Sequence, residues 1–354
     1  MEALIKNLRP LKTIEAAAVE IDLLSSPQIN WYLPNMLAKY SLNGLSNVVK
    51  PGKISVPGDM VRVFKIIPDD ADVKIRSTTR RLIIDYESTI YKIKYHASEI
   101  DIPECREEDG RVAIMSAESL LKSFRSLPDS GDKVIFNFKE SLVEVLLFDP
   151  KIHAKIAADC QSTKIFSYCI DKKAIQTLKI LLRDAKGDIW ISGNDNIIRV
   201  TSGCWVSEIV AKEYTAITWE ESGYFGLRVE AVINKMLRFF RVLSICKSPC
   251  RIWFSDNRIV GEATSDILSE RIEVPVNIYG ASLRNAITVN PETFICALEG
   301  CKVFGSTVAI QIGENCPVKV SCPYYDCDFL IFPISENYCQ PDFYGEREMA
   351  TACT

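Results

Sequence analysis

Apolar residues recur at helical spacing in six stretches of the chain, and successive stretches lie about 55 to 60 residues apart. Runs of alternating or continuous apolar residues, typical of strands, fill the intervals between them. A fixed period of this length predicts an array of one supersecondary unit, in which a strand precedes a helix of about three turns and short strands follow. The six stretches are centred near Leu8, Arg62, Leu121, Thr177, Met236 and Ala297.

The polar positions on these stretches are mostly basic. In the predicted helix over residues 229–243, Lys235 and Arg238 share one face, and Met236 and Phe239 lie on the other. The other predicted helices cover residues 3–13, 58–67, 117–127, 172–184 and 291–300. Basic residues follow one face of the first five helices: Lys6, Arg9, Lys12, Arg62, Lys65, Lys122, Arg125, Lys172, Lys179, Arg183, Lys235, Arg238 and Arg241. One such stripe is typical of a solvated helix face, but five in one array indicate a shared function.

Acidic residues on the predicted helices lie mostly at their starts. Asp59, Glu118 and Glu230 fall in first turns, where the helix dipole favours negative charge. Asn290 followed by Pro291 predicts the start of the sixth helix. This helix differs from the others, because residues 291–300 carry glutamates and no base.

The strands between the helices are short and end in turn-forming residues. Residues 188–191 and 197–201 flank a Gly-Asn-Asp-Asn turn, and residues 251–254 and 258–262 flank Ser-Asp-Asn, so both pairs predict hairpins. One unit has too little core to stand alone, so two units are expected to form each domain. The prediction is an α+β chain of three tandem domains, each of two βαβββ-like units, over residues 1–108, 109–221 and 222–335, with a C-terminal tail over 336–354.

Composition narrows the class of protein. The 354 residues are 47% hydrophobic and 25% charged, which is ordinary for a globular protein. We find no secretory signal and no apolar run of about 20 residues that would span a bilayer, so a cytoplasmic protein without membrane association is expected. The net charge of −4 does not favour a nucleic-acid binder, but phosphate contacts depend on local rather than total charge.

Thirteen cysteines are present, but no pair has the Cys-x-x-Cys spacing, and the chain has only His96 and His153. A structural zinc site is therefore not expected, and we expect the thiols to act as small buried apolar groups. We also expect no cofactor, because the sequence contains no Walker loop, no Gly-x-Gly-x-x-Gly and no His-Glu-x-x-His. The two histidines are interpreted as a surface residue and a residue at a pocket edge.

Three tandem doubled units with basic helices resemble the bacterial sliding clamp family, the β subunit of DNA polymerase III. The resemblance is clearest over residues 287–298, 308–312 and 329–334, which look like the last unit of the family and its closing apolar-Pro-apolar stretch. Residues 224–276 and 52–103 are similar to two earlier units. The resemblance implies the DNA clamp fold and a homodimer that closes head to tail into a ring.

What the resemblance implies about function is a non-enzymatic processivity factor in DNA replication. Such a ring encircles double-stranded DNA without sequence specificity, with helices lining the hole and sheet forming the outside. It binds DNA polymerase and the clamp loader through their short peptide motifs. Contacts with phosphates need not be tight, because the ring holds DNA by topology.

The resemblance also places two kinds of contact site. Tyr91, Val242 and Leu243 align with residues of the family's ring-closing interface, although all three also suit a plain core role. The partner-peptide pocket aligns with Phe148, Asp149, Lys151, His153, Tyr214, Ile217, Leu330, Phe332, Pro333 and Ile334. Only Asp149, Ala154 and Tyr214 match the family's pattern in the two stretches from the middle domain. This departure indicates a divergent clamp with altered peptide specificity.

Two alternatives remain open from the sequence. One is a clamp-like scaffold for repair or mobile-element proteins, which would need the same ring and pocket. The other is a metal-dependent nuclease, because Asp129 followed by Asp149 and Lys151 has the spacing of a Pro-Asp … Asp-x-Lys site. Against the nuclease, Pro128-Asp129 follows a predicted helix in the same way as Pro68-Asp69, which is typical of a repeated turn. A proline between Asp149 and Lys151 would also distort the strand that must present them.

Overall fold

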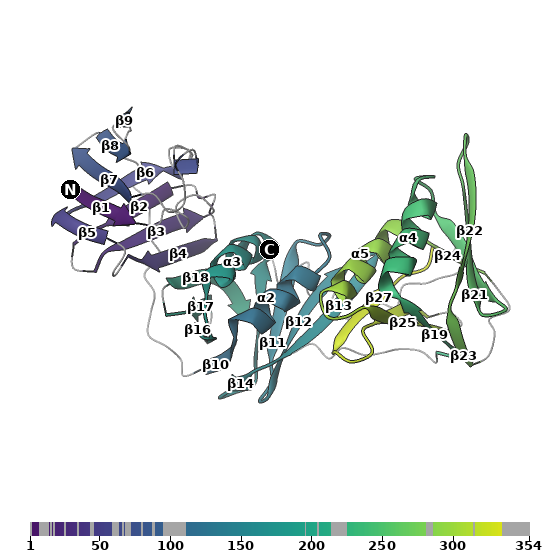
Figure 1. The fold of residues 1–354 in the computed structure, drawn as a ribbon. Helices are drawn as coiled ribbons and strands as arrows, with labels where there is room; N and C mark the ends of the chain where they lie inside the picture. Colours follow the sequence, from purple (N-terminus) through teal and green to yellow (C-terminus); the bar gives the residue numbers. More distant parts are fainter. Residues whose placement is uncertain are drawn as a thin grey trace. The chain divides into compact units, whose positions relative to one another are not determined.

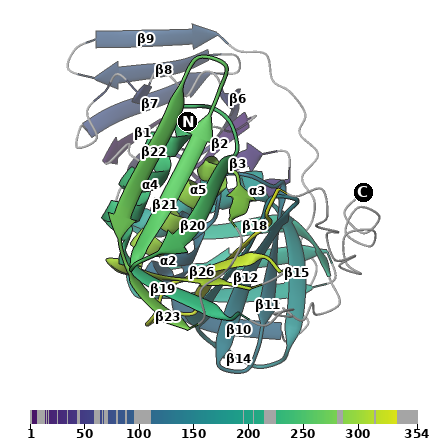
Figure 2. The same ribbon diagram turned by 90° about the vertical axis from the view of Figure 1, so that its right-hand side faces the viewer.

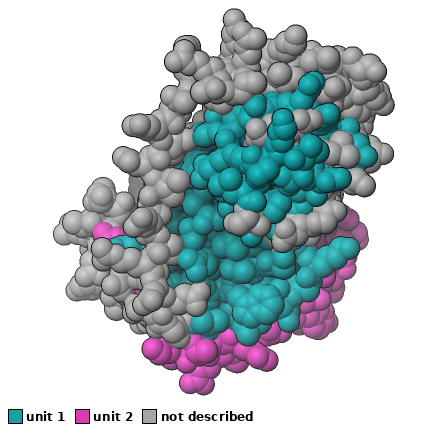
Figure 3. All heavy atoms as spheres, turned by 90° about the vertical axis from the view of Figure 1, so that its left-hand side faces the viewer, with its two compact units in different colours: residues 1–117, 173–211 teal, residues 118–172, 212–354 magenta. Residues whose placement is uncertain are grey.

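The computed structural model of the chain describes residues 2–334 apart from 7–13, 15, 17, 25, 34, 43–45, 59–63, 66, 68–71, 79–80, 87–88, 95–110, 195, 204, 214–224, 281–285 and 314–315. The chain forms two compact units (Figure 3). Unit 1 consists of residues 1–117 and 173–211, and unit 2 of residues 118–172 and 212–354. The three-domain division expected from the period stays a prediction, and the proposed tail lies outside the described residues.

Unit 1 contains a five-stranded antiparallel sheet in the order β5-β1-β7-β8-β9 (Figure 1). Its strands are β1 (Glu2–Lys6), β5 (Ser46–Lys50), β7 (Asp72–Thr78), β8 (Arg81–Tyr86) and β9 (Thr89–Lys94). The helix predicted to begin at residue 3 is therefore wrong at its start, because residues 2–6 form β1. Ala3 and Ile5 are both fully buried, a period of two that the sheet satisfies and a helix does not.

A second sheet of unit 1 is continuous and antiparallel in the order β6-β2-β3-β4-β18-β17-β16-β10. Pairing of β4 with β18 joins segments about 170 residues apart in sequence, so the sheet crosses the boundary predicted at residue 108. The hairpin expected at residues 188–201 is confirmed as β16 and β17. The strands are β2 (Ala18–Asp22), β3 (Gln28–Leu33), β4 (Met36–Ser41), β6 (Lys53–Pro57), β10 (Arg111–Ser116), β16 (Asp188–Asn194), β17 (Ile197–Thr201) and β18 (Trp205–Glu213).

The main sheet of unit 2 is also continuous and antiparallel, in the order β15-β11-β12-β13-β27-β26-β25-β19-β23. Pairing of β13 with β27 joins the second and third predicted domains in one sheet. The strands are β11 (Lys133–Phe138), β12 (Leu142–Asp149), β13 (Ile152–Asp159), β15 (Phe166–Asp171), β19 (Leu227–Val232), β23 (Asn277–Gly280), β25 (Thr307–Ile312), β26 (Val318–Ser321) and β27 (Cys327–Ile331). The two-residue strand β14 (Gln161–Ser162) is not part of this order.

A smaller sheet in unit 2 has the order β22-β21-β20-β24 and packs against helix α4 (Figure 2). Its strands are β20 (Cys250–Ser255), β21 (Arg258–Thr264), β22 (Ser269–Pro275) and β24 (Ile287–Val289). The hairpin predicted at residues 251–262 is confirmed. Its two turn residues, Asp256 and Asn257, have φ of 50° and 58°, the left-handed conformation that a two-residue hairpin turn of type I′ requires.

The helices α2 (Ala117–Ser126), α3 (Lys172–Asp184), α4 (Ile233–Ser244) and α5 (Pro291–Lys302) lie where the sequence predicts them. The predicted apolar faces are buried, as Phe124, Leu178 and Phe240 show. Asn290 caps α5 by accepting the N–H of Glu292 at 3.0 Å, and Pro291 follows it, as expected. Helix α4 starts later than the predicted residue 229, because residues 227–232 form β19. Among the described residues, none of these helices is long and apolar enough to cross a membrane.

Three of these helices form one layer in unit 2. Figure 1 shows α2, α5 and α4 in a row along the sheets. Phe240 of α4 stacks on Phe294 of α5, with ring centroids 4.2 Å apart. At Gly300 of α5, a Cβ atom would lie 2.6 Å from the carbonyl oxygen of Ser126 in α2, so only glycine allows this approach.

Candidate nucleic-acid face and partner-peptide site

The basic stripes predicted for α2 and α4 are exposed on unit 2. Lys122 and Arg125 of α2 are exposed, and so are Lys235, Arg238 and Arg241 of α4. Together α2, α4 and α5 carry six basic and three acidic side chains, a net charge of +3 in a chain of net −4. We call this helix layer the basic face. Its local positive potential can attract phosphates even though the chain as a whole is acidic.

Two ion pairs lie on the basic face. Lys122 binds Glu118 one turn away at 2.8 Å, and this lysine holds the pKa of Glu118 below its ordinary value. Arg241 of α4 binds Glu299 of α5 at 2.5 Å. Exposed pairs of this kind contribute little to stability and are screened by salt. Both cations can therefore exchange their carboxylates for phosphates at little cost.

The other basic residues of the five predicted stripes have different outcomes. On α3, Arg183 is exposed and Lys179 is half-buried. Lys65 is exposed in a short turn, and Lys6 is the last residue of β1 rather than part of a helix. Arg9, Lys12 and Arg62 lie outside the described residues.

Lys172 does not belong to the basic stripe on which the sequence places it. Its side chain is buried, and its Nζ donates to the carbonyl oxygens of Pro128 and Ser130, at 2.5 Å each. The lysine therefore fixes the loop that follows α2, a structural role for a buried cation.

Most described residues of the predicted partner-peptide site lie together in unit 2. Phe148 of β12 is opposite His153 of β13, and His153 is opposite Leu330 of β27. The His153 ring lies edge-on to Phe148 and Phe332, with centroids 4.9 Å and 4.6 Å away. Burial lowers the pKa of His153 to about 4, so the ring is neutral at physiological pH and acts as an aromatic filler. It is a buried residue rather than the pocket-edge residue expected.

Backbone contacts fix the chain around this aromatic cluster. The Asp149 carboxylate accepts the N–H of Lys151 at 2.9 Å, which closes the turn between β12 and β13. The Phe332 N–H donates to the Lys151 carbonyl oxygen at 3.3 Å. Pro333 is half-buried and Ile334 is 47% exposed, so the accessible apolar surface lies at this end of the chain segment. Tyr214 and Ile217 lie outside the described residues.

Of the three residues expected at a ring-closing interface, two remain candidates for it and one is a core residue. Tyr91 lies in β9, an edge strand of its sheet in unit 1, and β22 is an edge strand in unit 2. Val242 is half-buried at the end of α4. Leu243 is fully buried, and its Cδ1 would be 2.5 Å from a Cβ atom at Gly261. Leu243 is therefore a core residue, and its interface assignment is corrected.

The nuclease alternative requires Asp149 and Lys151 to project from one strand. Instead, Asp149 ends β12, and Lys151 lies in the turn before β13 begins at Ile152. Asp129 is exposed in the loop after α2. Within the described part of the chain, no group of three or more His, Cys, Asp or Glu side chains is arranged to hold a metal ion.

Solved structures to which this chain is similar include β subunits of DNA polymerase III. The β subunit from Thermotoga maritima aligns with a TM-score of 0.84 at 12% identity, over 94% of this chain and 99% of that protein. The sliding clamp from Bacillus subtilis aligns at 0.79 and 13%, over 95% and 99% of the two chains. The Pseudomonas aeruginosa clamp bound to griselimycin aligns at 0.79 and 16%, over 95% and 99%.

No protein-family model matches the sequence, and no curated protein matches it. At 12–16% identity the likeness establishes the fold and leaves the residues of each site to be argued from this chain. The chain therefore has the α+β fold of the bacterial sliding clamp, as its resemblance to that family predicts.

Proposed function

We propose that the chain is a sliding clamp, a processivity factor that closes as a homodimer around double-stranded DNA and tethers a polymerase to it. The observation that carries this proposal is the basic face on a clamp fold. Lys122, Arg125, Lys235, Arg238 and Arg241 expose positive charge from two helices of unit 2, while the whole chain is acidic. A ring that holds DNA by enclosure needs weak, sequence-independent phosphate contacts of this kind.

The edge strands support ring closure. β9 of unit 1 and β22 of unit 2 each end a sheet within the described part of the chain. An unpaired edge is a template for another strand, so β22 of one copy can pair with β9 of a second. Two such contacts close a head-to-tail ring, and Tyr91 and Val242 would lie in or near them.

The partner-peptide site is proposed at the aromatic cluster of Phe148, His153 and Phe332. The Pseudomonas aeruginosa clamp in the comparison binds griselimycin. Here we propose that Pro333 and Ile334 present an apolar wall to a short peptide motif of the polymerase and of the clamp loader. The neutral His153 ring makes this site less polar than a charged histidine would.

Ring formation and enclosure are tested together. Solution mass should be about twice 39.8 kDa at micromolar concentration. Protein bound to a circular duplex at high protein concentration should stay bound in high salt, and cutting the circle should release it, since enclosure rather than affinity holds it. A monomer, or equal retention on cut and intact circles, would contradict the proposal.

A further inference from the structure

A groove in unit 2 borders the basic face at Lys122 and shares no residue with the partner-peptide site. It has a volume of about 350 Å³ and is bordered by α2, β13, the end of α5 and the turn between β26 and β27. Ala157, Ala158 and Phe304 supply apolar lining, and Tyr324 and Tyr325 form one wall. We call it the tyrosine groove.

Both tyrosines are exposed, and Tyr325 is held in place. Tyr324 is 85% exposed and Tyr325 is 53% exposed. The Tyr325 N–H donates to the Cys322 carbonyl oxygen at 3.3 Å, and its own carbonyl oxygen accepts the Cys327 N–H at 2.7 Å. The Tyr325 ring also packs on Phe304, with centroids 5.4 Å apart. Rigid exposed aromatic side chains beside a hollow are the usual anchors of protein interfaces, because little entropy is lost when a partner covers them.

Charge at the tyrosine groove selects the kind of partner. Asp159 and Asp326 are both exposed at its edge, and no described basic side chain forms an ion pair with either. The lining contains one basic side chain, Lys122, against these two carboxylates. The groove is therefore net acidic, which repels phosphate and favours a cationic ligand.

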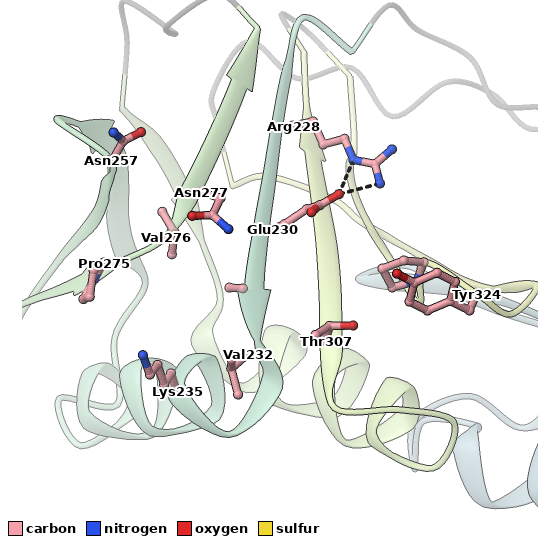
Figure 4. A pocket seen from close by; sticks show the side chains of 12 residues that line it. Arg228, Glu230, Val232, Lys235, Asn257, Pro275, Val276, Asn277, Thr307 and Tyr324 are labelled. Carbon is pink, nitrogen blue, oxygen red and sulfur yellow. Dashed lines mark hydrogen bonds and ion pairs between the residues drawn. The ribbon is translucent and has the colours of Figure 1, made fainter.

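Tyr324 also lines a second hollow, of about 630 Å³ (Figure 4). In Figure 4, Tyr324 lies near Arg228 and Thr307, and Asn257 is at the opposite end. Arg228 and Glu230 form an ion pair there at 2.8 Å and so satisfy each other's charge. Tyr324 thus lines both hollows, so a peptide chain that crosses it can contact each of them.

We propose that the tyrosine groove binds a partner protein through a short peptide, with an apolar side chain in the groove and Lys or Arg beside Asp159 and Asp326. The site is separate from the predicted partner-peptide site, since none of its lining residues belongs to that set. The proposal does not depend on ring closure or DNA binding. A clamp with such a second site can hold two partners at once.

The test uses the full chain and a fluorescein-labelled probe peptide, a central Leu-Leu pair with two lysines on each side, titrated by fluorescence anisotropy. Binding with a Kd below about 1 mM is expected, and a matched probe with glutamates in place of the lysines should bind at least about ten-fold more weakly. Combining Tyr324→Ala with Tyr325→Ala should raise Kd about five-fold or more. Combining Asp159→Asn with Asp326→Asn should raise it about three-fold and reduce its salt dependence.

Two control variants test whether the probe peptide binds at the tyrosine groove. Ile334→Ala alters the predicted partner-peptide site, and Ile267→Ala removes a side chain that is 97% exposed elsewhere in unit 2. Both should leave Kd unchanged. Absence of binding by the lysine probe, equal binding by the groove variants, or loss of binding in Ile334→Ala would overturn the proposal. A competition with single-stranded oligo-dT provides a further test. If oligo-dT displaces the probe and its own binding requires the two tyrosines, the groove binds nucleic acid and the proposal is overturned.

Discussion

Lys155 of β13 and Asp328 of β27 lie directly opposite each other in the antiparallel register, with Nζ and Oδ2 3.6 Å apart. Lys319 of β26 reaches the same carboxylate oxygen at 3.4 Å. All three side chains are mostly buried, so one carboxylate joins three neighbouring strands. The strand pair β13–β27 is also the junction between the second and third predicted domains. This ion triad therefore fixes the register in which that junction forms.

Asp328→Ala should destabilise unit 2, because it removes a carboxylate that two mostly buried lysines share. We expect a loss of about 2 to 4 kcal/mol in the free energy of unfolding, measured by urea denaturation. Glu273→Ala is the matched control, since Glu273 also binds two basic residues, Arg258 and Arg271, but at an exposed site. Its loss should be much smaller, because exposed ion pairs contribute little to stability. Equal losses in the two variants would show that the triad has no special role.

Local pattern was enough to predict α2, α3, α4 and α5, because each has a strong apolar face. It failed at residues 3–6, where Ala3 and Ile5 satisfy a strand period within a stretch that also fits a helix. It also misplaced Lys172, because the carbonyl groups that bury this lysine are 42 and 44 residues earlier in the chain.

The candidate sites also differ in whether local sequence was enough to predict them. The basic face could be predicted because its residues lie on two helices with clear periodicity. The pairing of His153 with Phe332 and of Lys155 with Asp328 depends on a strand register between segments more than 170 residues apart, which no local pattern specifies. The tyrosine groove was missed because Tyr324 and Tyr325 lie in a turn without any motif.

Gly300→Ala tests the close packing of α5 on α2. The added Cβ would lie 2.5 Å from Cζ of Phe329 and 2.6 Å from the carbonyl oxygen of Ser126, so helix and sheet must move apart. We expect a loss of about 2 to 4 kcal/mol in stability, although alanine normally favours a helix. Gly203→Ala is the control, because nothing lies within 4 Å of a Cβ atom there. Thermal unfolding of both variants measures the difference, and an unchanged midpoint in Gly300→Ala would contradict the packing.

Protonation of His153 should weaken the fold at mildly acidic pH. Burial lowers its pKa from 6.5 to about 4, so above pH 6.5 the ring is neutral in both folded and unfolded chains. Between pH 6.5 and 4 the unfolded chain takes up a proton that the folded chain excludes, so stability falls as pH is lowered through this window. The contribution is at most about 3 kcal/mol. His153→Gln cannot titrate, so its stability should fall less between pH 6.5 and 4, as urea denaturation at several pH values would show.

Phosphate binding by the basic face should appear as a change in salt dependence. Each cation that contacts a phosphate adds about 0.9 to the slope of log K against log salt for duplex DNA. Arg238→Ala combined with Lys235→Ala should therefore weaken duplex binding and reduce the slope by up to about 2, with little effect on unfolding, since both side chains are exposed. Lys164→Ala removes an exposed lysine from the loop before β15 and should leave the slope unchanged. If the double variant keeps the wild-type slope in fluorescence titrations, these two side chains do not face DNA, and the basic face loses its assigned role.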